Sequence, residues 1–298
     1  MTEGTAVNVI RTIKSLYREE RWIWRTALLG LALGGVCLVA MAVHGPRIEP
    51  EGTLYKAASF DVAVGIYLLT IALMVPLAGF SERGRRIWRW TLVPPVWYGY
   101  GIETVQIFRG LDPRFSRVGG PVDQILGLVF FLSALGIFVN FLVLTARFLF
   151  RRLASADNAA LVLALRYATV AAVLAFSIGI AMSALQGPRM GARGNLLPLH
   201  ASGFHGLQAV PLVALLMSWS ALDARASRRL VHVAGLAWLG FCAAVAWQSF
   251  SGRSVLEPSP ASVIAAAFLL VYVAIFLRAA LQFRRQGVWP PTLASAGL

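Results

Sequence analysis

The fold is decided by an uninterrupted apolar run, Ile125–Ala146, which reads ILGLVFFLSALGIFVNFLVLTA and contains no charged residue. A helix of this length, rising about 1.5 Å per residue, crosses the roughly 30 Å hydrocarbon core of a bilayer. Seven further runs have comparable length and character. The predicted spans are residues 26–43, 58–80, 91–108, 122–148, 160–186, 205–222, 229–250 and 261–281. We therefore predict an all-α fold, a polytopic membrane bundle of eight transmembrane helices.

The composition agrees with this class of protein. Of the 298 residues, 58% are hydrophobic and only 13% are charged, about half the charged share of a soluble domain. These values exclude a soluble enzyme, a disordered protein and a coiled coil. Because the connections are short, residues 26–281 are predicted to form one membrane domain between an N-terminal segment (1–25) and a C-terminal tail (282–298). We find no convincing internal repeat in the sequence.

The net charge of +14 arises from short Lys and Arg clusters between the apolar runs. No basic stripe with stacking aromatics follows a soluble segment, so nucleic acid is excluded as a partner and the lipid bilayer is expected. With a cytoplasmic N-terminus, 18 Lys and Arg fall on inner segments and 8 on outer ones. This bias predicts an N-in, C-in protein of the cell inner (plasma) membrane. Both terminal segments are then cytoplasmic.

The N-terminal segment leaves two interpretations open. Apolar residues recur at helical spacing among basic ones over residues 5–22, which is typical of an amphipathic helix lying on the membrane surface. The alternative is a helical extension of the first span. The triplet Ala40–Ala42 resembles a signal-peptide cleavage site, but 25 residues precede its apolar run, so we predict an uncleaved first helix.

The third predicted span is the most unusual one. Two adjacent prolines and two glycines interrupt it over Pro94–Gly101, and Glu103 and Gln106 then share one helix face. Arg109 follows at the outer end, where it could neutralise Glu103. One interpretation is a kinked helix with an interfacial ion pair. The other is the wall of a polar cavity, with Glu103 as a catalytic base or ligand and with Gln106 and Arg109 in contact with a cofactor.

Three of the four histidines, His44, His200 and His205, fall on the predicted outer face together with Asp61 and Glu103. Neutral imidazoles and carboxylates are usual ligands of zinc, iron and manganese. The set suits a single metal ion, with Asp61 orienting an imidazole, or a haem held by His44 and a second histidine. The alternative is that the imidazoles bond only to loops and water.

Other polar or reactive residues favour structural roles. Cys37 and Cys242 lie inside apolar runs and are predicted to be buried thiols. Asn140 is expected to connect helices, and Arg166 to extend toward the inner membrane surface. The small residues Gly30, Gly34 and Gly35 are predicted to allow close helix packing.

Two stretches resemble a broad group of uncharacterised bacterial multi-pass membrane proteins. They are YGYGIETVQIFRGLDPRF (Tyr98–Phe115) and LPLHASGFHGLQAVP (Leu197–Pro211). Members of that group carry a similar His-x4-His-x-Leu-Gln-x2-Pro element at the start of a helix and a Glu in an earlier span. The resemblance covers about residues 55–220. It implies that Glu103, His200, His205 and Gln208 act as a set, with Gln208 in contact with a cofactor, and it implies no particular reaction.

Three function classes are consistent with these features. The first is a membrane enzyme or redox protein that holds a metal ion or a haem in an outward-facing His and carboxylate pocket. The second is a transporter of a small solute or ion, with Glu103 at the coupling site. The third is a non-catalytic subunit that binds membrane-protein partners laterally.

Overall fold

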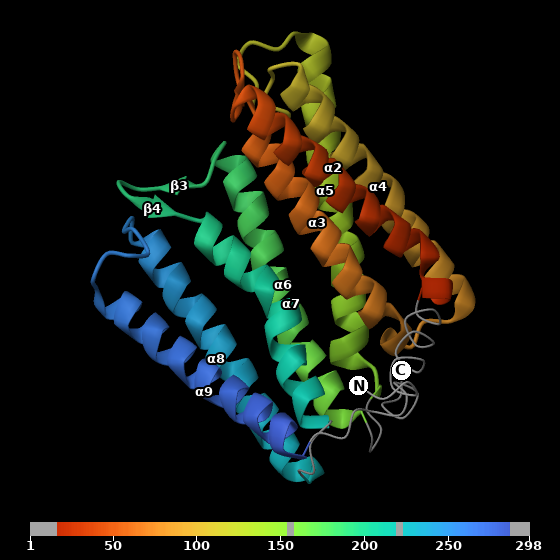
Figure 1. The fold of residues 1–298 in the computed structure, drawn as a ribbon, viewed down its shortest axis with the longest axis vertical. Coiled ribbons are helices and arrows are strands. Elements are labelled where there is room, and N and C mark those ends of the chain that lie inside the picture. Colours follow the sequence, from red (N-terminus) through yellow and green to blue (C-terminus); the bar gives the residue numbers. More distant parts are fainter. Residues whose placement is uncertain (1–16, 154–157, 219–222, 287–298) are drawn as a thin grey trace. The chain divides into compact units, whose positions relative to one another are not determined.

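The computed structural model describes residues 17–153, 158–218 and 223–286, which are dominated by long α-helices (Figure 1). The helices are α2 (Arg21–His44), α3 (Leu54–Met74) with the 3₁₀ turn η1 (Val75–Ala78), α4 (Glu82–Phe108), α5 (Pro121–Phe150), α6 (Ala159–Ala184), α7 (Leu197–Ser218), α8 (Ala224–Phe250) and α9 (Pro260–Gln286). Two short antiparallel hairpins join them, β1 (Arg47–Ile48) with β2 (Gly52–Thr53), and β3 (Arg189–Met190) with β4 (Gly194–Asn195). The predicted all-α class is confirmed.

Seven of the helices in the described residues are long and apolar enough to cross a membrane, so the chain is a multi-pass membrane protein. They are α2, α3 with η1, α5, α6, α7, α8 and α9. The helix α4 is 27 residues long, but five charged residues crowd its first eight positions. An eighth crossing by α4, and the orientation of the termini, stay predictions.

The sixth predicted span begins earlier than expected, at Leu197 rather than at residue 205, so His200 lies in a helix and not in a link. The Asn195 side chain accepts a hydrogen bond from the Leu197 amide at 2.9 Å, and Pro198 falls in the first turn, where no amide donor is needed. The amphipathic segment predicted over 5–22 falls mostly outside the described residues, as does the tail beyond residue 286.

The chain divides into two compact units. The N-terminal unit comprises residues 15–76 and 80–143, and the C-terminal unit includes residues 77–79 and 144 onward. In the N-terminal unit α2 lies along α3, and in the C-terminal unit α6 lies along α7 and α8 along α9 (Figure 1).

The two units repeat one order of elements, a helix, a hairpin and three further helices. A shift of 142 residues carries β1 onto β3 and β2 onto β4. The segment 44–54 reads HGPRIEPEGTL and the segment 186–196 reads QGPRMGARGNL, with identical residues at five of the aligned positions. The chain therefore contains an internal repeat that our sequence analysis did not detect.

Hydrogen bonds at the hairpins follow the same 142-residue shift. The Leu54 amide donates to the Pro46 carbonyl at 3.0 Å, and the Leu196 amide donates to the Pro188 carbonyl at 2.8 Å. One further hydrogen bond joins each hairpin to the turn that follows a later helix. The Glu51 amide donates to the Gly110 carbonyl after α4 at 2.8 Å, and the Arg193 amide donates to the Gly252 carbonyl after α8 at 2.9 Å. The repeat is thus a property of backbone structure as well as of sequence.

The paired turns make a matched stability experiment possible. Gly110 and Gly252 both have a positive φ, +77° and +71°. A Cβ at Gly110 would lie 2.0 Å from the Glu49 carbonyl oxygen, whereas at Gly252 the nearest atom would lie 3.5 Å away. Gly252→Ala is expected to cost about 1 to 2 kcal/mol for left-handed strain, and Gly110→Ala clearly more because a backbone clash is added. Thermal unfolding in one detergent measures both, and equal shifts would contradict this account.

Candidate functional site: a buried carboxylate pair

Close packing of α2 brings the polar residues of α3 and α4 together in the N-terminal unit. A Cβ at Gly30 would lie 2.1 Å from the Tyr100 hydroxyl and 2.8 Å from the Asp61 carbonyl oxygen. A Cβ at Gly34 would lie 2.5 Å from Cγ2 of Val62. The predicted packing role is therefore confirmed for these two glycines, whereas Gly35 faces open space.

Two carboxyl groups lie inside this packing. The side chains of Asp61 on α3 and Glu103 on α4 are both 0% exposed. Thr104 Oγ1 donates a hydrogen bond to Asp61 Oδ2 at 3.1 Å. Among the described residues, neither Oδ1 of Asp61 nor Oε1 of Glu103 has a hydrogen-bond partner. A buried carboxylate oxygen without a donor is energetically costly, which marks the pair as a candidate site.

Glu103 is neutralised by Arg114, which comes from the loop between α4 and α5. Arg114 Nη2 lies 2.8 Å from Glu103 Oε2, and the Arg114 side chain is 34% exposed. The guanidinium also lies over the rings of Phe60 and Phe130, 5.3 and 5.5 Å from their centroids. Arg114 thus connects the buried carboxylate with the partly exposed loop.

Arg109, the predicted partner of Glu103, binds elsewhere. Its Nη1 lies 2.7 Å from Asp123 Oδ1 and donates to Gln106 Oε1, while Gln106 Nε2 donates to Asp123 at 3.0 Å. Arg109 is the C-cap of α4 and follows its last turn, so its side chain reaches the start of α5. Gln106 is buried and fixes this connection.

Another carboxylate, that of Glu51 in the first hairpin, orders the loop that carries Arg114. It accepts hydrogen bonds from the Ser116 hydroxyl at 2.6 Å and from the Arg117 amide at 2.8 Å. Asp112 in the same loop forms a 2.9 Å ion pair with Lys56. The Ser116 hydroxyl chiefly lowers the pKa of Glu51. Partial burial opposes ionisation of Asp112, but the Lys56 ammonium and backbone amides prevail and lower its pKa.

Acid is therefore expected to loosen this loop. Because both pKa values are lowered in the folded chain, the stabilisation is complete above the unfolded values of about 4.3 for Glu and 3.9 for Asp, and it is lost as the pH falls through the folded ones. The unfolding temperature of Glu51→Gln should therefore fall less than that of the wild type as the pH is lowered from about 5 to about 3. The exposed Glu82→Gln variant is the control, and an identical acid profile for Glu51→Gln would contradict the assignment.

The predicted metal or haem ligands are not assembled within either unit. His44, at the end of α2 in the N-terminal unit, is exposed, and so is His205 on α7 in the C-terminal unit. His200 is half-buried, and its Nδ1 lies 2.8 Å from the Ala175 carbonyl oxygen while its ring packs edge-on against Phe204. Over the residues that the structure describes, no group of three or more His, Cys, Asp or Glu could hold a metal ion.

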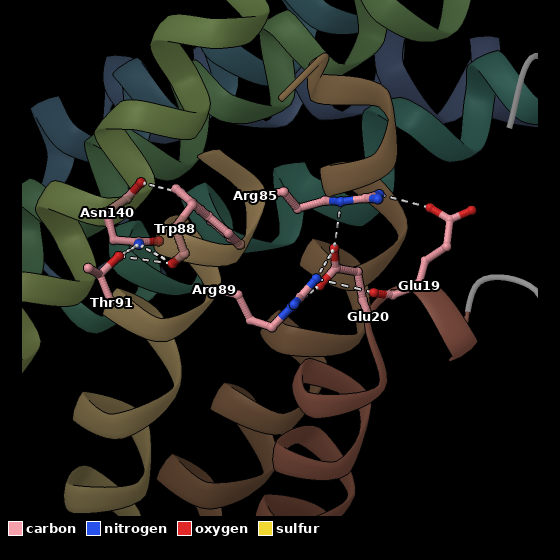
Figure 2. A network of polar contacts seen from close by, with 7 residues as sticks. All are labelled: Glu19, Glu20, Arg85, Trp88, Arg89, Thr91 and Asn140. Atoms are coloured by element: carbon pink, nitrogen blue, oxygen red, sulfur yellow. Dashed lines mark hydrogen bonds and ion pairs between the residues drawn. The ribbon is translucent and has the colours of Figure 1, made fainter. Parts of the chain in front are cut away.

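An ion-pair network that was not predicted from the sequence lies at the start of α4 (Figure 2). The Glu20 side chain is 0% exposed, and its two oxygens lie 2.7 and 3.1 Å from Nε and Nη2 of Arg89. Arg85 lies 3.6 Å from Glu20 and 2.9 Å from Glu19. Two features of the sequence could have predicted this network. They are the pair of acidic residues inside a basic segment and the two arginines spaced four apart on one helix face.

The other half of Figure 2 connects α4 with α5. Asn140 Nδ2 donates to the Trp88 carbonyl at 2.9 Å and to Thr91 Oγ1 at 2.8 Å, and Trp88 Nε1 donates to the Asn140 carbonyl at 2.9 Å. The predicted interhelical role of Asn140 is thus confirmed. Arg166 Nε donates to the Phe148 carbonyl at 2.9 Å, so it ties α6 to the end of α5.

Comparisons with family models, with curated proteins and with solved structures find no match for this chain.

Proposed function

We propose that the chain is a membrane transporter that couples the movement of a small solute to protons, with Asp61 and Glu103 as the proton-binding pair. The observation that carries the proposal is the burial of both carboxyl groups, each with one oxygen that meets no donor among the described residues. Ionisable residues inside membrane-spanning helices are costly and typically mark ion or proton pathways. Binding of a proton or a cation removes the cost of the buried charge.

A chain of polar side chains leads from the partly exposed loop to this pair and supports proton access. Arg114 is partly exposed and pairs with the buried Glu103, whose chain neighbour Thr104 donates to Asp61. Protonation of Glu103 would weaken its attraction to Arg114, because the guanidinium would then face a neutral group. A proton arriving from the loop could thereby loosen a contact that holds the loop against α4.

The internal repeat gives independent support for transport. Parallel repeats recur in secondary transporters, where each half is built from the same order of helices. The carboxylates are confined to one copy, because the 142-residue shift places Gly203 at the position of Asp61 and Val245 at that of Glu103. The N-terminal unit is therefore assigned the proton-binding role.

The metal- or haem-binding enzyme has weaker support, because no group of three or more His, Cys, Asp or Glu in the described part of the chain could hold a metal ion. No observation singles out a non-catalytic subunit. The bias of Lys and Arg favours the cell inner membrane with both termini inside, which fits a carrier driven by a proton gradient.

Reconstitution tests the proposal. The purified chain is placed in liposomes containing a trapped pH-sensitive dye, and amino acids, sugars and carboxylic acids are added outside in turn. At least one solute should change the internal pH in liposomes with the chain and not in liposomes carrying Asp61→Asn/Glu103→Gln. Proton movement that is equal in the two preparations, or solute uptake without proton movement, would refute the coupling.

A further inference from the structure

The arginines in the first turns of α4 divide between two faces of the helix, whose centres lie roughly 110° apart at about 100° per residue. Arg85 and Arg89 turn toward Glu19 and Glu20, and these contacts neutralise their charges (Figure 2). Positions 83, 86, 90 and 97 fall within an arc of roughly 60° beside the face that carries Arg85 and Arg89. Glu19 and Glu20 therefore do not account for the arginines of the second face.

This second face carries charge and aromatic surface together. Arg83 and Arg86 are exposed and form no ion pair with any residue that the structure describes. Trp90 and Trp97 are 41% and 40% exposed, although large aromatic side chains gain most by burial. An aromatic surface beside unpaired positive charge is suited to a ligand with an apolar body and an anionic head.

Residues of α2 complete this surface. The Trp22 ring centroid lies 5.5 Å from that of Trp90 and 6.3 Å from that of Trp97, and the Arg25 guanidinium lies 5.4 Å from the Trp22 centroid. Trp97 Nε1 donates to Thr26 Oγ1 at 2.9 Å. The indoles are thus held by mutual packing and by a hydrogen bond. We call this surface the Trp/Arg patch; it comprises Trp22, Arg25, Arg83, Arg86, Trp90 and Trp97.

We infer that the Trp/Arg patch binds an anionic phospholipid. The guanidinium groups of Arg83 and Arg86 hold the headgroup phosphate by charge-assisted hydrogen bonds, and the indoles pack against the glycerol and the upper acyl chain. Charge complementarity favours this ligand, because a zwitterionic lipid would leave the arginines without net neutralisation. The inference is independent of the proton-binding site, which uses other residues.

Quenching of tryptophan fluorescence by brominated lipids tests the inference on the full chain. The chain is reconstituted in phosphatidylcholine vesicles with increasing brominated phosphatidylglycerol, and separately with brominated phosphatidylcholine. Trp90→Phe/Trp97→Phe identifies the part of the signal that comes from the patch. The test variant is Arg83→Gln/Arg86→Gln. The matched control, Arg228→Gln/Arg229→Gln, removes two charges from exposed positions at the start of α8, where no tryptophan precedes Trp238.

The wild type should be quenched by phosphatidylglycerol at lower fractions than by phosphatidylcholine. The test variant should weaken this preference roughly 30-fold, about fivefold for each charge, and the control should keep it. Equal quenching by the two lipids in the wild type would overturn the inference. An equal loss of the lipid preference in the test variant and in the control would also overturn it, because it would indicate general electrostatic attraction. Loss of the preference on addition of inorganic phosphate alone would overturn it as well.

Discussion

Glu103→Gln is expected to move protons at no more than about one hundredth of the wild-type rate, since proton transfer by a positioned group is typically worth about 100-fold or more. The amide keeps the shape of the buried side chain but can neither bind nor release the proton. Asp61→Asn should have a similar effect, because Asp61 is buried as well and accepts a hydrogen bond from Thr104, the chain neighbour of Glu103. Dye-loaded liposomes measure the rate with the solute that drives flux in the wild type.

Glu82→Gln is the matched control for these variants, because Glu82 is an exposed carboxylate in the first turn of the same helix. It should keep the wild-type rate. Equal helical circular dichroism and equal recovery in liposomes show that the buried variants are folded. Folded Glu103→Gln with wild-type proton flux would contradict the assignment of this residue.

Arg89→Gln is expected to lower the free energy of unfolding by about 3 kcal/mol, at the lower end of the range for breaking a buried ion pair. The change leaves the Glu20 carboxylate buried, and among the described residues Arg85, at 3.6 Å, is then the one cation paired with it. An uncompensated buried charge costs more than the pair contributes, because its desolvation is no longer offset. Denaturant unfolding in mild detergent measures the loss.

Two further variants separate this mechanism from a general effect of charge. Arg86→Gln removes the same charge from an exposed position three residues earlier and should change stability by less than about 0.5 kcal/mol. The double variant Glu20→Gln/Arg89→Gln removes both charges and should recover much of the loss. A double variant as unstable as Arg89→Gln alone would show that packing, rather than unpaired charge, dominates at this position.

The helices were predictable because an apolar run of about 20 residues has few alternatives to a helix in a bilayer. The ends of the helices were harder to predict. The start of α7 at Leu197 depends on a cap from Asn195 and on a proline in the first turn, which is also typical of a loop. The repeat escaped notice because its identities are concentrated in one short hairpin, while its helices share little beyond apolar character.

The candidate site was predictable in its residues and less so in its contacts. Asp61 and Glu103 stood out because carboxylates are rare in apolar spans. Spacing along the helix suggested Arg109 as the partner of Glu103, whereas a loop folded around Glu51 presents Arg114 instead. The histidines were predicted to lie together because a count of spans assigned them to one membrane face. Residues on the same face can still be far apart, so the count did not predict contacts between their side chains.

The most direct test of the central claim is an infrared difference titration of the reconstituted chain, following the carbonyl stretch of protonated carboxyl groups. The proposal predicts that Asp61→Asn and Glu103→Gln each lose part of the titrating band of the wild type and that the double variant loses both parts. The other carboxyl groups still titrate, and Glu82→Gln loses only the contribution of one exposed carboxyl group. A double variant whose spectrum matches that of the wild type at every pH would show that the buried pair exchanges no protons and would refute the proposed function.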